Sequence, residues 1–114
     1  MPGGEGARGQ AGTWDTLGYA YHHLGDHPKA VDCYRRSLRL NRVLGHRYNE
    51  AETLVHLSHT HRATGAIGAA RETLRQALAL YREIQAPDAE VEQVRALLAE
   101  LPQSARSAVP RSGP

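Results

Sequence analysis

Apolar and polar residues alternate along the centre of the chain with the period of an α-helix. The first apolar set recurs at steps of three and four residues: Trp14, Leu17, Ala20, Tyr21 and Leu24. Gly25 follows directly, and glycine is the residue that most often ends a helix. The pattern therefore predicts a helix that reaches Leu24 and then turns.

A second helix is predicted immediately after this turn. Asp26 is placed to cap it, and Pro28 suits its first turn. Its inner face is predicted to consist of Ala30, Val31, Tyr34, Leu38 and Val43. Gly45 is expected to end it, so the two segments form a helix–turn–helix unit.

The unit is repeated when the chain is shifted by 40 residues. Nine positions of the first unit then fall on the same residue in the second, among them Gly25 with Gly65 and Ala30 with Ala70. A shift of 37 also aligns some residues, but it places Gly25 on Arg62 and loses the turn. The 40-residue register predicts a second pair of helices at about 48–63 and 67–84. The inner residues of that pair are expected to be Leu54, Leu57, Ala70, Leu74, Ala77 and Leu78.

A fifth helix is predicted after Pro87, which breaks the chain. Asp88 is expected to cap it, and its apolar residues are Val91, Val94, Leu97, Leu98 and Leu101. The fold class is therefore all-α, with repeats at about 11–44 and 51–84 and a capping helix at about 88–101, together forming one domain at 11–101. The Gly-rich segment 1–10 and the Pro/Ser/Arg-rich tail 102–114 are predicted to be disordered.

The first repeat reads Trp14-x-x-Leu17-Gly18-x-x-Tyr21 and then Ala30-x-x-x-Tyr34. This pattern resembles the tetratricopeptide repeat (TPR), with Tyr34 where Phe is usual. The resemblance implies a helical solenoid, in which small residues such as Gly18 and Ala30 let the two helices approach closely. The second repeat keeps the small residues and lacks the aromatic ones. Because 40 residues exceed the standard 34, we expect a longer connection after each second helix.

At finer grain, residues 11–100 resemble the C-terminal TPR arrays of large actinobacterial transcriptional activators of the antibiotic-regulatory type, which carry a nucleotide-binding ATPase core. The runs TWDTLGYAYHHLGDHPKAVDCYRRSL and LGHRYNEAETLVHLSHTHRATG carry this likeness. In that family the array serves interaction and regulation. No GxxxxGK[ST] loop or DNA-binding helix-turn-helix is present in this sequence, so ATP and DNA binding are not carried over. The alternative to a stand-alone scaffold is a detached fragment of such an activator, active only with its DNA-binding and ATPase domains.

The TPR resemblance implies a concave groove that binds a protein or peptide partner. The groove-facing residues expected from it are Asp15, Tyr19, His22, His23, Glu52, Val55, His59 and Arg62. Helical periodicity agrees, because these residues lie opposite the stripes that contain Leu17 and Leu57. Tyr19 is the expected apolar anchor for an extended or helical peptide.

Seven histidines raise the question of a metal site. His56 and His59 are three residues apart on one helix, and His22 and His23 could face them across the groove. Neighbouring residues on a helix diverge by about 100°, however, and no HExxH or cysteine pattern accompanies the histidines. The sequence therefore predicts no metal and no cofactor. Histidines in the groove would instead make its charge depend on pH near neutrality.

The remaining chemistry excludes several function classes. A net charge of +2 and an arginine stripe at Arg35, Arg39 and Arg42 do not indicate nucleic-acid binding. Cys33 is expected to be a packing residue, and no nucleophile is paired with a base, so no enzyme is predicted. No segment is apolar enough to span a membrane or act as a signal peptide, and a cytoplasmic location is expected.

A solenoid repeat relies on its neighbours to bury its apolar face. The fifth helix can cover the second repeat, whereas the Gly-rich residues 1–10 cannot cover the first. We therefore expect the N-terminal face of the first repeat to be open and to serve self-association or docking.

Overall fold

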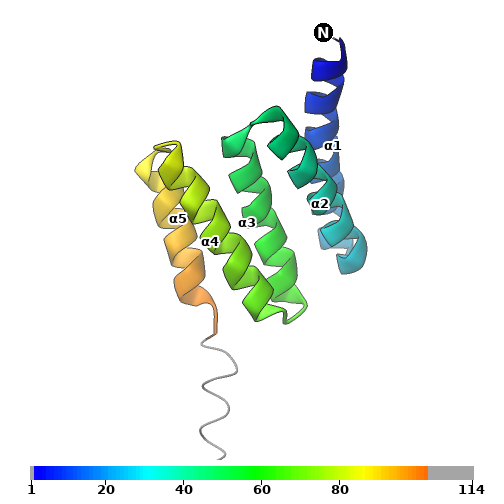
Figure 1. The fold of residues 1–114 in the computed structure, drawn as a ribbon. Coiled ribbons are helices and arrows are strands. Elements are labelled where there is room, and N and C mark those ends of the chain that lie inside the picture. The colour runs from blue at the N-terminus through cyan, green and yellow to red at the C-terminus, as the bar shows by residue number, and fades with distance from the viewer. Residues whose placement is uncertain (1, 103–114) are drawn as a thin grey trace, which may run out of the picture.

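The computed structural model describes the backbone of residues 2–102 and the side chains of residues 9–102. Every regular element in that part of the chain is a helix. The five helices are α1 (Pro2–Leu24), α2 (His27–Leu44), α3 (Arg47–Ala63), α4 (Ile67–Glu83) and α5 (Asp88–Glu100). Figure 1 shows that they follow one another side by side in chain order. The all-α helical-repeat architecture expected from the sequence is confirmed.

The turns repeat at the expected interval of 40 residues. After α1, the backbone N–H of Asp26 donates to the carbonyl of Tyr21 at 2.9 Å. After α3, the N–H of Ala66 donates to the carbonyl of His61 at 2.8 Å. Such bonds satisfy carbonyl groups that the end of a helix would otherwise leave unpaired. The two helix pairs are therefore built alike.

Gly45 and Gln85 occupy the equivalent turns after α2 and α4. Both have a positive φ, 73° at Gly45 and 55° at Gln85. Glycine adopts this left-handed conformation without strain, whereas a residue with a Cβ does not. The second repeat has thus kept the backbone geometry of this turn and lost the glycine that suits it.

Predicted capping is confirmed at α2 and is wrong at α5. The Asp26 side chain accepts a hydrogen bond from the Lys29 backbone N–H at 3.3 Å, and Pro28 lies in the first turn of α2. At α5 the capping position is Pro87, and Asp88 is the first residue of the helix. The extended backbone of Pro87 starts the helix one residue earlier than a cap at Asp88 would allow.

The additional length of the repeat lies in the helices. Only Gly45 and His46 separate α2 from α3, so the expectation of a longer connection is wrong at this point, while residues 84–87 separate α4 from α5. Helix α2 is 18 residues long and α4 is 17. No glycine or proline interrupts α2 between Pro28 and Gly45, so the helix extends until Gly45 ends it.

Gly18 allows α1 and α2 to approach closely. A Cβ atom at Gly18 would lie 2.6 Å from Cε1 of Tyr34, which is shorter than any ordinary carbon–carbon contact. Ala30, the other small residue of the signature, is fully buried. The reason inferred from the sequence for both small residues is therefore correct.

The core lies between the two helix pairs and extends to α5. In the second repeat Leu54, Leu57 and Leu74 are buried, as predicted. Helix α5 contributes Val94 and the adjoining chain contributes Leu101, and both are buried. Helix α5 therefore covers the outer side of the second repeat.

The first repeat is less covered than its apolar pattern suggests. Leu17 is 38 % exposed and Leu24 is 78 % exposed, although both belong to the apolar set that recurs along this helix. No helix among residues 9–102 packs against that side of α1. Val43 is 83 % exposed because it points away from both neighbouring helices, so its assignment to the core is wrong.

Helix α1 begins at Pro2, where the sequence predicts a disordered segment 1–10. Proline is favoured in the first turn of a helix, and an established helix extends at little cost through residues such as Ala7 and Arg8. The glycines of this segment do not interrupt the helix. The predicted disordered tail, apart from Pro102, lies outside the described residues.

Candidate functional site

Helices α1 and α3 present the candidate binding surface. Each is the first helix of its pair, so the two run in the same direction and lie next to each other. Tyr19 and His23 are one turn apart on α1, as are His56 and His59 on α3. This spacing places each pair on one side of its helix.

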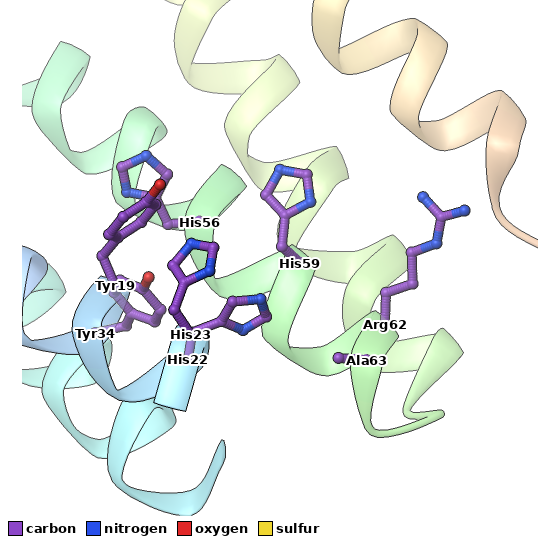
Figure 2. A pocket seen from close by; sticks show the side chains of 8 residues that line it. All are labelled: Tyr19, His22, His23, Tyr34, His56, His59, Arg62 and Ala63. Atoms are coloured by element: carbon purple, nitrogen blue, oxygen red, sulfur yellow. The ribbon is translucent and has the colours of Figure 1, made fainter. Parts of the chain in front are cut away.

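A groove of about 460 Å³ lies between these side chains (Figure 2). It is lined by Tyr19, His22, His23, Tyr34, His56, His59, Arg62 and Ala63. The lining contains imidazoles, phenols and a guanidinium group, with no carboxylate. Its side chains can therefore donate hydrogen bonds to an anionic group and pack against an aromatic or aliphatic one.

Aromatic contacts hold the α1 side of the groove in place. The ring of Tyr19 lies edge-on to His23, with the ring centroids 4.3 Å apart, and its centroid is 6.4 Å from that of His56. The buried ring of Tyr34 lies below, with its centroid 6.0 Å from that of His56. Tyr19 is nevertheless 56 % exposed, so a ligand can reach it.

A hydrogen bond joins α1 to α3 beside the groove. Nδ1 of His56 donates to Oδ1 of Asp15 at 2.9 Å. This hydrogen bond, with the Asp15 charge, raises the pKa of His56 although burial opposes the effect. The shift favours the protonated, positively charged form of His56.

Two other histidines of the groove, His22 and His59, have their pKa shifted in the opposite direction. Burial lowers the pKa of His22, and the neighbouring His23 and His27 lower it further. Burial also lowers the pKa of His59, with a smaller contribution from His56. Nδ1 of His22 shares a 2.9 Å hydrogen bond with the hydroxyl of Thr60, which ties α1 to α3 a second time.

The neighbouring space between α3 and α5 is bridged at both ends. The Tyr48 hydroxyl donates to Glu90 at 2.6 Å, and this hydrogen bond raises the pKa of Tyr48 to about 12. At the other end, Arg62 donates to Glu100 at 3.3 Å. These two contacts join α3 to α5.

A second pocket of about 270 Å³ continues the groove toward the N-terminal ends of α1 and α3. It is lined by Ala11, Gly12, Asp15, Thr16, Ser37, Asn41, Asn49, Glu52 and Thr53. Its charged groups are the two carboxylates of Asp15 and Glu52. The Ser37 hydroxyl donates to the carbonyl of Ala11 at 2.8 Å and fixes the pocket floor.

The structure distributes the eight expected groove residues over three environments. Tyr19, His22, His23, His59 and Arg62 line the larger pocket together. Asp15 and Glu52 line the smaller one. Val55 is only 6 % exposed and belongs to the core, so its assignment to the groove is wrong. Helix α3 packs against both α2 and α4, and its buried face is wider than one stripe.

The sequence interpretation missed two groove residues that the structure reveals. Tyr34 had been assigned wholly to the core, yet it also forms part of the groove floor. His56 had been noted only as a partner of His59 for a metal. Its spacing of three residues from His59 was the signal that could have placed it in the groove.

Three further features of the described residues concern metal ligands, arginine ion pairs and membrane-spanning helices. Among residues 9–102, no three histidine, cysteine, aspartate or glutamate side chains are grouped so that they could hold a metal ion. Arg42 of the arginine stripe pairs with Glu50 at 2.7 Å, and Arg36, beside the stripe, pairs with Asp32 at 3.2 Å. None of the described helices is both long and apolar enough to cross a membrane.

Comparison with known proteins agrees with this architecture. A family model described as tetratricopeptide repeat matches residues 9–83, which is more than half of the chain. A comparison with curated proteins found no match. The match includes both helix pairs and both sides of the groove, and the chain therefore belongs to the tetratricopeptide repeat family.

Proposed function

We propose that this chain is a non-enzymatic scaffold that holds a peptide segment of a partner protein in the groove between α1 and α3. Tetratricopeptide repeats in general mediate protein–protein interactions, which supports the broad class. The observation that carries the proposal is the groove itself, with Tyr19 exposed at its edge.

The composition of the groove suits a peptide. The residues that contribute most to binding at protein interfaces are often aromatic side chains or arginines. Tyr19 is such a side chain, and the contact with His23 restrains its ring. His59 and Arg62 on the opposite helix supply the hydrogen-bond donors.

A regulatory role is part of the proposal, and a second candidate function follows from it. The likeness of residues 11–100 to activator arrays suggests a fragment that acts only together with DNA-binding and ATPase domains. The exposure of Leu17 favours this candidate, because its counterpart Leu57, forty residues later, is buried. A neighbouring part of a larger regulator would cover Leu17 in the same way.

We further propose that, in the isolated chain, a second copy covers this face of α1. The exposed stripe consists of Gln10, Thr13, Leu17, Ala20 and Leu24. It carries no charge, so two copies can bring the same stripe together around a two-fold axis without repulsion.

A comparative pull-down tests the groove function. Wild-type protein is compared with a variant that carries Tyr19→Ala, His23→Ala, His59→Ala and Arg62→Ala. A matched control carries Arg39→Ala and Arg75→Ala, two exposed residues on α2 and α4. We expect a partner that binds wild type and the control and is lost from the groove variant. Partners that bind all three proteins equally would contradict the proposal.

A further inference from the structure

The charge of the α1–α3 groove changes sign along its length. One part, here called the histidine segment, consists of the residues that line the larger pocket and contains His22, His23, His56, His59 and Arg62. The other part, the carboxylate segment, lines the smaller pocket and contains Asp15 and Glu52. The lining of each segment contains no charged group of the opposite kind.

The two segments follow one another along the same pair of helices. On α1, Asp15 precedes Tyr19 by one turn, and on α3, Glu52 precedes His56 by one turn. One turn corresponds to a rise of about 5–6 Å along the helix axis. Because α1 and α3 run in the same direction, both helices present carboxylates at the same end of the groove and imidazoles at the other. An extended peptide of a few residues spans both segments.

The hydrogen bond between His56 and Asp15 marks the boundary between the segments. It neutralises part of the Asp15 charge and leaves Glu52 as the carboxylate available to a ligand. Glu52 is exposed and forms no ion pair or side-chain hydrogen bond within residues 9–102. Its charge helps to raise the pKa of His56, one turn along α3, and its carboxylate oxygens remain accessible to a ligand.

At the opposite end, Arg62 is the permanent cation. Its pairing with Glu100 at 3.3 Å lies at the surface, with both side chains about half exposed. An exposed ion pair of this kind is weak, so a ligand carboxylate can replace Glu100. His23, His59 and Arg62 belong to the same lining, and in the view of Figure 2 His59 stands between the other two.

We infer that the ligand of this groove is a peptide with a fixed polarity: a lysine or arginine at the carboxylate segment and an aspartate or glutamate at the histidine segment, beside Tyr19. This inference rests on the proposed function and specifies the chemistry of its ligand. Charge complementarity of this kind selects the partner and the direction in which it lies, more than it raises affinity. A peptide in the reverse direction would place its acidic group against Glu52 and its basic group against Arg62.

Selection from a displayed library of random twelve-residue peptides tests the inference. The library is selected against the wild-type chain, and enriched peptides are synthesised for binding measurements by fluorescence polarisation. We expect enriched peptides to carry a basic and an acidic residue in a constant order. Peptides that bind in the groove are recognised by loss of binding to a Tyr19→Ala variant.

Charge reversal in the protein then tests each segment separately. Glu52→Lys is expected to weaken binding about tenfold, and replacing the basic residue of the peptide by Glu is expected to restore it. Arg62→Glu is expected to act in the same way on the acidic residue of the peptide. Glu72→Lys, at an exposed glutamate on α4, is the matched control and should leave binding unchanged.

The outcomes separate this inference from the function on which it rests. Peptides that lose binding to Tyr19→Ala but show no charge order, or that tolerate Glu52→Lys, would overturn the polarity and leave groove binding intact. Selection that yields no peptide sensitive to Tyr19→Ala would overturn the proposed function and this inference together.

Discussion

The ring of Tyr34 lies directly against the backbone of Gly18, and a Cβ at Gly18 would be 2.6 Å from the Tyr34 Cε1 atom. Gly18→Ala should therefore force α1 away from α2 and lower stability by about 1–3 kcal/mol. A matched substitution is Gly12→Ala on the same helix, where a Cβ would meet nothing within 4 Å. It should raise stability by about 0.5–1 kcal/mol. Thermal unfolding followed by circular dichroism checks both, and equal effects of the two substitutions would contradict this account of the helix contact.

The turns after α2 and α4 give a second prediction. Gln85 has a φ of 55° in the position that Gly45 occupies in the first repeat. Gln85→Gly should remove this strain and raise the free energy of unfolding by about 0.5–1 kcal/mol, while Gly45→Gln should lower it by about 1–2 kcal/mol. Urea unfolding measures both changes. A destabilising Gln85→Gly would show that the Gln85 side chain contributes more than its backbone conformation costs.

Three histidines of the groove should titrate in a defined order. Because the hydrogen bond and charge of Asp15 raise the pKa of His56, whereas burial lowers those of His22 and His59, His56 should lose its proton after His22 and His59 as pH rises. NMR titration of the imidazole protons measures this order directly. A pKa of His56 below that of His59 would contradict the assigned role of Asp15.

The hydrogen bond between His56 and Asp15 should also make the stability of the fold depend on pH. The folded chain holds the His56 proton more tightly than the unfolded chain, so protonation of His56 adds to the free energy of unfolding. This stabilisation is fully present below the ordinary histidine pKa of 6.5 and is lost as pH rises through the pKa of the folded chain. The stability difference between wild type and Asp15→Asn should therefore be larger at about pH 5.5 than at about pH 8.5. A difference that does not change with pH would show that the pair gives no pH-linked stability.

The open face of α1 predicts concentration-dependent association. Wild-type protein should form dimers that dissociate on dilution, and Leu17→Glu with Leu24→Glu should render it monomeric, because the shared stripe would then carry charges. Val43→Glu is the control, since Val43 is 83 % exposed on α2, away from the stripe. Sedimentation velocity measures the distribution. A wild-type chain that is monomeric at high concentration would contradict self-association.

Residues that act locally were predicted well from the sequence. Gly25 and Gly65 mark turns through a backbone conformation that depends on few neighbours, and Asp26 caps α2 through atoms three residues away. The 40-residue register could be read from such positions alone. Gly18 was also interpreted correctly, because the repeat signature contains both the glycine and its partner Tyr34.

Residues whose environment depends on more distant helices were predicted poorly. Leu24 follows the apolar period of α1, yet periodicity cannot tell whether another helix covers that side. Val55 was assigned to the groove, but it is buried because α2 and α4 pack against a wide face of α3. The sequence of α3 alone does not show how wide that face is. His56 was overlooked in the groove because its partner Asp15 is 41 residues away in the sequence. The order of charges along the groove depends on α1 and α3 lying next to each other, and the sequence alone does not show that neighbourhood.

The most direct test of the central claim is an NMR titration of the ¹⁵N-labelled chain with a peptide enriched by selection. If the groove between α1 and α3 is the binding site, the largest shift changes will fall on Tyr19, His23, His56 and His59. Changes confined to the outer faces of α2 and α4, at residues such as Arg39 and Arg75, would place the ligand on the opposite side of the molecule and contradict the proposed function.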